Sequence, residues 1–338
     1  MDSAEPYLAL IDAFADRLLA VVGDVVADEF VYGRVARVSR EAPVLILEYD
    51  TTEIVPGGAG NAANNVASLG DRARLVTVLG RDESARRLIA GLHRRVDRGA
   101  ILRDPEHGTP VKTRILAGGI HSAKQQVVRI DRRVRRATGP RTREAFERAA
   151  LKAVKGCDAV LVSDYGSGLV KPAFVRRLRA MVGRDVPVLV DTRYRLLSYR
   201  GFDACTPNES EVEHALGVRI NDDRRTLERA GREILATTRM RAVLITRGGR
   251  GMALFEPGQP TCHIPIFGSD EIADVTGAGD TVMATVALAR SAGATFEQAA
   301  RLANYAGGIV VMKRGTATVG AEELRRAVTT DHAERARG

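Results

Sequence analysis

The chain has 338 residues, of which 45% are hydrophobic and 28% charged, and no apolar run approaches the roughly 18 residues that a membrane-spanning helix needs. The formal net charge of +9 could mark a nucleic-acid surface, but the arginines are scattered, aromatic residues make up 4% and tryptophan is absent. Composition therefore argues against membrane and nucleic-acid partners, although excess cations also attract phosphate-bearing ligands into a cleft.

Taken in chain order, the apolar residues predict alternating helices and strands. Residues 1–17 mix acidic and apolar side chains at helical spacing and lack the basic start of a signal peptide, so we expect a short surface helix. Buried strands are predicted at 19–23, 74–79, 159–163, 187–191 and 242–246, and helices at 61–69, 82–96, 143–154 and 222–235. This alternation predicts a doubly wound α/β fold in which helices flank a mainly parallel sheet, with ligands at the carboxyl ends of its strands.

Two regions, 33–54 and 109–133, break this alternation. Each contains strand-like apolar runs, at 44–47 and 126–130, without an intervening helix. We expect these regions to pair as a small β-sheet lid, inserted into a single domain that spans residues 1–338. An apolar lid face needs either the substrate cleft or another subunit against it, so the pattern also suggests a homodimer formed through the lid.

The spacing of the cysteines gives evidence on the cellular compartment. Cys157, Cys205 and Cys262 are far apart in the chain and form no Cys-x-x-Cys pair. This spacing favours neither a zinc site nor a disulfide framework, and it fits a protein of the reducing cytoplasm.

The clearest chemical signal is the run D-V-T-G-A-G-D-T at residues 274–281, directly before an apolar helical stretch at 282–292. Gly277, Ala278 and Gly279 can point successive backbone N–H groups into one cavity at a helix N-terminus, which favours anions. Asp280 falls in the first turn, where its carboxylate can accept a proton from an attacking hydroxyl while the N–H groups hold a phosphoryl group. The alternative is an ordinary helix cap, in which Asp280 only satisfies backbone donors.

The run at 274–281 resembles the C-terminal signature of the PfkB carbohydrate kinases, and P-G-G-A-G-N-A-A at 56–63 resembles their N-terminal signature. Within this family the chain is most similar to the kinase part of the heptose-phosphate enzymes that serve lipopolysaccharide inner-core synthesis. The residues that carry this likeness are V-G-D at 22–24 with Asp28, Y-G at 32–33, R-V-S at 37–39, E-A-P at 41–43, Q-Q at 125–126, R-I-D at 129–131 and S-D-Y at 163–165.

The resemblance implies an enzyme that uses ATP and Mg²⁺ to phosphorylate a sugar hydroxyl, with Asp280 as the base and residues 277–279 as the anion hole. The implied acceptor is D-glycero-β-D-manno-heptose 7-phosphate. It further implies a nucleotide side made of the N-x-x-E element Asn208, Glu209, Ser210 and Glu211, the loop residues Thr246, Gly248 and Gly251, Asn304 and the segment 313–316. Glu211 is the expected Mg²⁺ ligand, because a carboxylate suits a hard cation that keeps its water. Taken alone, each element could be a plain helix start or β-turn.

On the sugar side, Asp28 lies just after the first strand, where a carboxylate could accept hydrogen bonds from two hydroxyls, and Asp24 could support it. Glycines 57 and 58 would let the backbone approach a sugar, although they could serve only to shape the helix start, and Asn61 offers a donor and an acceptor to a hydroxyl. A sugar phosphate also needs cations, and the candidates in the lid segments are Arg37, Lys112, Arg114 and Arg129. Each of these could instead be a surface charge.

Two departures from the heptose-kinase pattern affect the acceptor. Ser167 stands where a lysine is expected, and Asp191-Thr192-Arg193 replaces Asp-Pro-Lys, so only one of the two charges is kept. A kinase for another sugar, sugar phosphate or nucleoside is therefore an alternative, as is a regulator that binds ligand without catalysis. The chain ends near where the kinase part should end, so we expect no adenylyltransferase activity.

Overall fold

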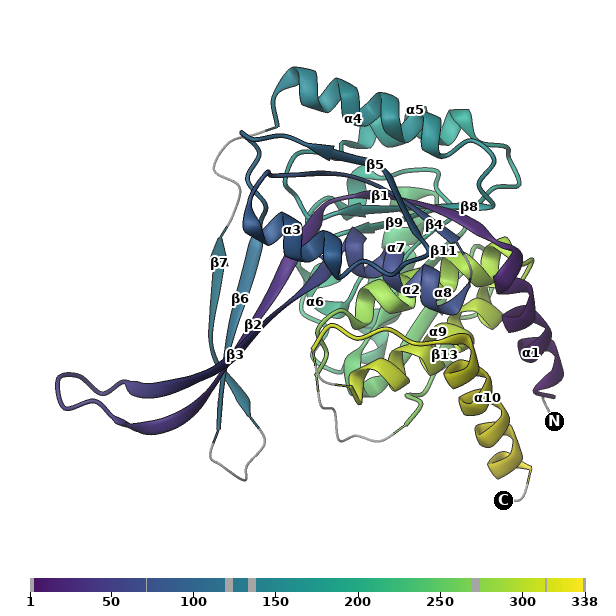
Figure 1. Ribbon diagram of the computed structural model, residues 1–338. Coiled ribbons are helices and arrows are strands. Elements are labelled where there is room, and N and C mark those ends of the chain that lie inside the picture. The colour runs from purple at the N-terminus through teal and green to yellow at the C-terminus, as the bar shows by residue number, and fades with distance from the viewer. Residues whose placement is uncertain are drawn as a thin grey trace.

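The computed structural model describes residues 3–70, 72–118, 124–132, 138–268, 274–313 and 315–336. Within them, the main sheet has the strand order β13–β12–β11–β10–β9–β8–β1–β4–β5 (Figure 1). Neighbouring strands from β11 to β5 are parallel, whereas β12 is antiparallel to both of its neighbours, β11 and β13. In chain order they are β1 (Leu18–Gly23), β4 (Arg72–Leu79), β5 (Val96–Arg103), β8 (Ala159–Asp164), β9 (Val188–Thr192), β10 (Ala204–Cys205), β11 (Ala242–Thr246), β12 (Met252–Phe255) and β13 (Cys262–Ile264).

This sheet confirms the predicted doubly wound α/β fold. Its central strands are the short branched runs of the sequence, and Val21 of β1 pairs with Leu75 of β4 on one side and Leu161 of β8 on the other. The chain passes from β1 to β4 and β5 on one side and then returns to β8 on the other side. The strand order therefore reverses between β1 and β8, and at such a point a parallel sheet opens a crevice at its carboxyl ends.

Helices cover both faces of the sheet (Figure 1). One face packs against α1 (Glu5–Asp12), α2 (Ala59–Leu69), α3 (Glu83–Ala90), α8 (Ala278–Ser291), α9 (Phe296–Val311) and α10 (Ala321–Arg335). The other packs against α4 (Pro140–Ala153), α5 (Pro172–Met181), α6 (Glu209–Leu216) and α7 (Arg224–Thr238). Short 3₁₀ helices are η1 (Ala13–Asp16), η2 (Leu196–Ser198) and η3 (Gly248–Arg250). None of the helices in the described part of the chain is long and apolar enough to cross a membrane.

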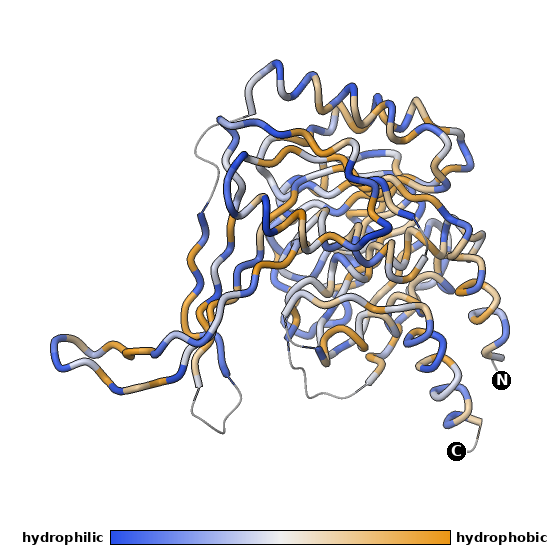
Figure 2. The backbone as a smooth tube through the Cα atoms, viewed as in Figure 1, coloured by the Kyte–Doolittle hydropathy of each residue, from blue (hydrophilic) through white to orange (hydrophobic). Residues whose placement is uncertain are grey.

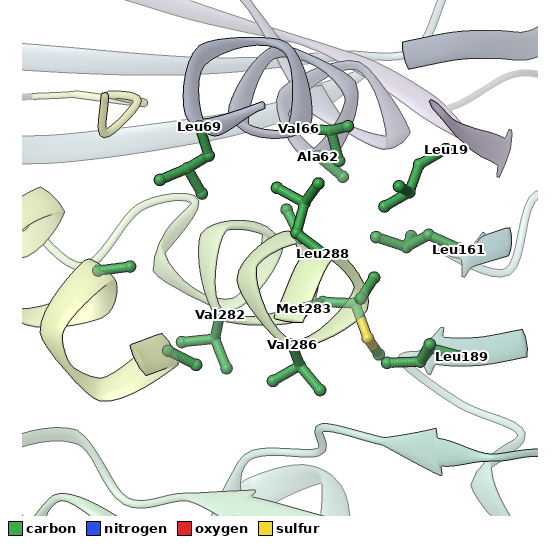
Figure 3. Packing of buried hydrophobic residues seen from close by; sticks show 14 of the residues in the cluster. Leu19, Ala62, Val66, Leu69, Leu161, Leu189, Val282, Met283, Val286 and Leu288 are labelled. Atoms are coloured by element: carbon green, nitrogen blue, oxygen red, sulfur yellow. The ribbon is translucent and has the colours of Figure 1, made fainter. Parts of the chain in front are cut away.

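Helices α2 and α8 lie together over the middle of the sheet. Figure 3 shows Leu288 and Met283 of α8 among side chains from α2, β1, β8 and β9. Every residue of α8 from 280 to 289 is buried, so this helix is apolar around most of its circumference, as a helix inside a core must be. Packing on all sides fixes the position of the α8 N-terminus, which is the start of the predicted catalytic run.

A second, four-stranded sheet of order β3–β2–β6–β7 projects from the main body (Figure 1). Its strands are β2 (Val25–Val38), β3 (Leu45–Gly58), β6 (Val111–Gly118) and β7 (Gln125–Arg132). The segments 33–54 and 109–133 lie along it, as expected of the lid, although β2 begins at residue 25 and β3 ends at residue 58; residues 119–123 and 133 lie outside the described residues. Apolar residues occur along the projecting strands as well as in the main body (Figure 2). The division into one domain with an inserted lid stays a prediction.

The helix expected at 82–96 is partly wrong. Helix α3 ends at Ala90, the chain turns at Gly91, and β5 begins at Val96. Glycine has a low helix propensity, and Val96 gains more from its place at the start of a sheet strand, where it is buried. Strands β5, β10 and β13 were not expected. Strands β10 and β13 have two and three residues, and such short runs carry too little periodicity to recognise.

Candidate functional site

The loops that follow β1 and β8 are tied together at the point where the strand order reverses. Asp24, the residue after β1, accepts hydrogen bonds from the backbone N–H of Tyr165 at 2.9 Å and of Ser167 at 3.2 Å. Its other oxygen accepts from the Ser167 hydroxyl at 2.5 Å. Burial raises the pKa of Asp24 to about 6 although these bonds oppose the shift. Asp24 therefore shapes the β8 loop, and Ser167, where a lysine was expected, is used in that loop.

Asp280 lies in the first turn of α8 and is 4% exposed. The side-chain N–H₂ group of Asn61 donates to its Oδ2 at 3.0 Å and to the carbonyl of Gly277 at 3.1 Å, and the Tyr165 hydroxyl donates to its Oδ1 at 3.1 Å. Gly277 has φ 80°, and a Cβ there would lie 2.6 Å from Nδ2 of Asn61, so only glycine fits. Burial raises the pKa of Asp280 to about 7, against the two hydrogen bonds that lower it. A carboxyl group with such a pKa can accept a proton near neutral pH.

The backbone amides at the start of α8 face a cavity. Among the described residues, the N–H groups of Gly277, Gly279 and Asp280 have no acceptor, whereas that of Ala278 reaches the carbonyl of Val275 at 3.3 Å. Nothing lies within 4 Å of where a Cβ of Gly279 would stand. These unpaired amides at a helix N-terminus form a place for an anion, with Ala278 contributing less than expected from the sequence.

This cavity, of about 360 Å³, begins at the α8 N-terminus and continues between β11, β12 and α9. It brings together five residues expected on the nucleotide side: Asn208, Thr246, Gly248, Gly251 and Asn304. The remaining walls are small or apolar: Met252, Ile266, Val275, Ala278, Gly279, Val282, Gly307, Gly308 and Val311. A glycine-rich, largely apolar cavity that ends at free amides suits a flat base at one end and a phosphate at the other.

The N-x-x-E element has two structural duties. Asn208 and Glu211 form a capping box at the start of α6: Oδ1 of Asn208 accepts from the Glu211 N–H at 2.9 Å, and Oε2 of Glu211 accepts from the Asn208 N–H at 3.0 Å. Glu209 accepts from Arg247 at 2.8 Å and also pairs with Arg250, which holds the loop after β11. Glu209 is thus engaged with arginines, and the exposed Ser210 is absent from the cavity lining.

One oxygen of Glu211 remains outside the capping box and belongs to an acidic region. Burial raises the pKa of Glu211. The pKa of Asp191, at the end of β9, is also raised, mainly by burial and secondly by the negative charge of Glu211. Asp191 was not singled out as a site residue from the sequence, although its place at the carboxyl end of a buried strand was a signal that could have found it.

A third set of residues lines a cavity of about 300 Å³ beside β6, β7 and the loops that follow β8 and β9. Cationic side chains dominate its charge: Lys112, Arg129, Arg132 and Arg193, with Asp24 and Asp131 as the acids; Tyr165, Ser167 and Tyr194 are also in the wall. Arg129 pairs with Asp131 at 2.9 Å and Arg132 with Glu29 at 2.7 Å. Among the described residues, neither Lys112 nor Arg193 has a carboxylate partner.

Asp28 is buried and bound to Arg114, with 2.5 Å between Oδ1 and Nη1. Its Oδ2 accepts from the Thr316 hydroxyl at 3.4 Å, and Gly57 lies against it, so closely that a Cβ there would be 2.1 Å from this oxygen. The charge of Asp28 is therefore balanced inside the protein. Arg114 serves this pair and is not among the residues that line the cationic cavity, so its contact with a sugar phosphate stays a prediction.

Three other predicted residues have clear places. Gly58 has φ 59°, and a Cβ there would lie 2.7 Å from the carbonyl of Asp24, so it allows α2 to begin close to the β1 end. Asn61 is occupied on both sides, because its Oδ1 accepts from Asn65 while its N–H₂ group holds Asp280 and Gly277. Arg37 is exposed in the distal part of the β2–β3 hairpin and does not line the cavity.

Tyr165 and Arg193 were the other important omissions. Both appear in the sequence only as parts of family-like triplets. Neither the contact of Tyr165 with Asp280 nor the lack of an ion pair to Arg193 among the described residues can be read from the chain. Of the weakly expected segment 313–316, residue 314 lies outside the described residues, and Lys313 donates to the carbonyl of Thr318 and pairs with Glu323.

Comparison with known proteins places these features in a family. Residues 16–323 match the pfkB family of carbohydrate kinases. The bifunctional protein HldE of Geobacter sulfurreducens is 39% identical over 317 residues, and that of Caulobacter vibrioides is 41% identical over 333 residues. These alignments cover 93% and 96% of this chain but 63% and 65% of the relatives, so the chain spans less than two thirds of their length.

Solved structures share the fold at lower identity. Arabidopsis thaliana ribokinase complexed with ribose and ATP is 20% identical, with a TM-score of 0.68 over 93% of this chain and 98% of that chain. Escherichia coli phosphofructokinase-2 in complex with substrates and products is 17% identical, with a TM-score of 0.75 over 93% and 99%.

Proposed function

Since this chain belongs to the pfkB family of carbohydrate kinases, we propose that it transfers the γ-phosphoryl group of ATP to D-glycero-β-D-manno-heptose 7-phosphate, giving the 1,7-bisphosphate for ADP-heptose and lipopolysaccharide core synthesis. The observation that carries the proposal is the position of Asp280 between two cavities. Its carboxylate accepts a hydrogen bond from Tyr165, which lines the cationic cavity. Asp280 is also the next residue in the chain after Gly279, which lines the glycine-rich cavity. The HldE relatives support the heptose assignment made from the sequence.

In the proposed reaction Asp280 is the general base. The sugar hydroxyl lies between its carboxylate and the γ-phosphorus, loses its proton to Asp280 and attacks in line with the leaving ADP oxygen. The free amides of Gly277 and Gly279 bind the charge that grows on the phosphoryl oxygens. The raised pKa of Asp280 suits this role, because a stronger base holds the transferred proton better and still ionises near pH 7.

Glu211 is the proposed Mg²⁺ ligand. Its free oxygen and the neighbouring Asp191 offer the hard, anionic donors that Mg²⁺ prefers, and burial raises the pKa of both carboxyl groups, as expected where a cation would restore the balance of charge. When bound, Mg²⁺ would neutralise part of the phosphate charge of ATP. Glu209, which was expected beside it, acts through Arg247 on the loop of the nucleotide cavity.

Lys112 and Arg193 support an acceptor that already carries a phosphate. Both line the cationic cavity and lack a carboxylate partner among the described residues, whereas Arg129 and Arg132 are already paired. Burial lowers the pKa of Lys112, and a doubly charged phosphate beside it would raise that pKa again. Arg193 keeps the charge of the lysine expected at this position, and its planar group can bind a phosphate with two hydrogen bonds.

The proposal includes a homodimer formed through the lid, in a cytoplasmic protein. Val38, Leu45 and Tyr49 on the β2–β3 hairpin and Ile130 on β7 are 47–67% exposed, which is costly for apolar side chains unless a second copy covers them. Light scattering at micromolar concentration tests this. A dimer that Tyr49→Asp converts to a monomer supports it, and a monomeric wild-type protein contradicts it.

The experiment that tests the function measures ATP consumption by the purified protein with Mg²⁺. The acceptors are heptose 7-phosphate, the same heptose without phosphate, ribose, fructose, fructose phosphates and adenosine. Selective turnover of heptose 7-phosphate supports the whole proposal. Turnover of another acceptor keeps Asp280 as the base and replaces the sugar. Ligand binding without turnover of any acceptor would instead indicate a non-catalytic regulator on this fold.

A further inference from the structure

Tyr165 stands between the proposed base and the acceptor cavity. It is the first residue after β8, its ring lines the cationic cavity, and its hydroxyl donates to Oδ1 of Asp280 at 3.1 Å. The other carboxylate oxygen, Oδ2, accepts from Asn61 at 3.0 Å. Among the residues that the structure describes, each oxygen of the base therefore has one protein donor, and the two donors come from different elements, α2 and the β8 loop.

The ring of Tyr165 is held on several sides. Its backbone N–H is bound to Asp24, and the absence of a side chain at Gly58 lets its ring pack there, since a Cβ would lie 3.3 Å from Cε2. Nζ of Lys112 lies 5.1 Å from the ring centroid on the cavity side. With the backbone and the ring both held, the hydroxyl oxygen stays within hydrogen-bond distance of Asp280.

We propose that Tyr165 is a positioning residue for phosphoryl transfer: together with Asn61 it fixes the plane of the Asp280 carboxylate and keeps it ionised, so that a free lone pair faces the sugar hydroxyl. A carboxylate has about four lone-pair sites, and the two protein donors leave the remaining sites for the substrate. This inference rests on the proposed function, because it assumes that Asp280 is the base.

The charges around Asp280 determine how removal of the Tyr165 hydroxyl acts. Burial is the largest influence and raises the pKa of Asp280, the hydrogen bonds from Asn61 and Tyr165 lower it, Asp28 raises it and Lys112 lowers it. Asp191 faces it as a further negative charge. The pKa of Tyr165 is itself raised well above its usual value, by burial and then by Asp280, so the hydroxyl remains a donor. Loss of this donor must therefore raise the pKa of Asp280.

The test compares Tyr165→Phe with Tyr199→Phe. Tyr199 is a matched control, since it is buried and its hydroxyl donates at 2.7 Å to Asp164, the last residue of β8, and not to Asp280. In Tyr165→Phe the acid limb of the kcat profile should move upward by about one pH unit, and the plateau should fall about tenfold. The KM for ATP should stay within about twofold of the wild type. In Tyr199→Phe the acid limb should stay where it is.

Two further measurements test the contact between Tyr165 and Asp280 even if Tyr165→Phe folds poorly or no acceptor is phosphorylated. Site-specific 3-fluorotyrosine at position 165 keeps the ring but strengthens the donor, so the acid limb should move to lower pH even if Tyr165→Phe folds poorly. The pH titration of the ¹³C carboxyl signal of Asp280, identified by its loss in Asp280→Asn, follows the same shifts without turnover.

If no acceptor is phosphorylated, the proposed function fails, and the NMR titration still tests the contact. If the wild type is active and Asp280→Asn is not, but neither Tyr165 variant moves the pH profile or the Asp280 titration, the positioning role alone is overturned.

Discussion

Asp280→Asn should remove the activity of the protein and stabilise it at alkaline pH. Burial raises the pKa of Asp280 from 3.8 to about 7, which means that the folded protein holds its ionised carboxylate at a cost. Asparagine has almost the same shape but no charge to bury. Its side-chain N–H₂ group can donate to the Tyr165 hydroxyl while its oxygen accepts from Asn61, so both neighbouring contacts can be kept with one reversed.

The magnitude follows from linkage between protonation and folding. The folded pKa lies above the unfolded one, so the folded state binds the proton more tightly, and stability falls as pH rises from about 4 to about 7. A shift of about three pKa units corresponds to about 4 kcal/mol in total, of which about 2–3 kcal/mol falls between pH 5 and pH 8. The asparagine variant does not lose this stability as the pH rises.

The assay is guanidinium unfolding of both proteins at pH 5 and pH 8. The difference in the free energy of unfolding, variant minus wild type, should rise by about 2–3 kcal/mol between the two pH values, while kcat falls by about 10²–10⁴-fold. Asp82→Asn is the control: burial raises the pKa of Asp82, but bonds from Thr109 and Ala85 lower it overall, so the stability that its charge adds is already complete above the unfolded pKa. The difference for that variant should therefore stay constant between pH 5 and pH 8. A pH-independent difference for Asp280→Asn would refute the reasoning.

Three further predictions concern the neighbouring residues. Arg114→Met leaves a buried charge unpaired and should lower the free energy of unfolding by about 3–5 kcal/mol, as measured by denaturant unfolding. Arg34→Met, which breaks two exposed ion pairs, should lower it far less. Gly277→Ala would place a Cβ 2.6 Å from the Asn61 side chain at φ 80°, and should lower kcat at least about tenfold in the ATP-consumption assay, with a Kd for the sugar that changes little in calorimetry. Lys112→Met should raise the KM for heptose 7-phosphate about tenfold or more but leave that for the unphosphorylated sugar within about twofold; equal effects on both would contradict a phosphate contact.

Several parts of the fold and the site were predictable because their signals are local. Strand β8 is a run of branched apolar residues, and the start of α8 is a glycine-rich turn before an apolar helix, where free amides are unavoidable. The lid segments were visible as β-rich runs without helices. Failures were local as well: the end of α3 depends on one glycine, and β10 has two residues, too few for any periodicity.

The role of each polar side chain was harder to predict, because it depends on which groups are near it. Arg114 and Lys112 are equivalent in the sequence, two residues apart in β6 and therefore on the same face of the strand. In the structure Arg114 reaches Asp28 and is buried, whereas Lys112 points its charge over Tyr165 into the cavity. The strand register pairs Asp28 with Lys112 and Phe30 with Arg114, so side-chain packing, rather than register, decides which of the two cations binds Asp28.

By itself the sequence determined the fold class, the helix start that carries Asp280 and the glycines around it, since these depend on periodicity and on backbone freedom over a few residues. Only the tertiary structure decided what surrounds that carboxylate. Asn61 lies 219 residues away from it in the chain and Tyr165 lies 115 residues away. They meet at Asp280 because the strand order reverses between β1 and β8 and because α2 packs beside α8 over that point, and such long-range neighbours are set by packing of the whole core.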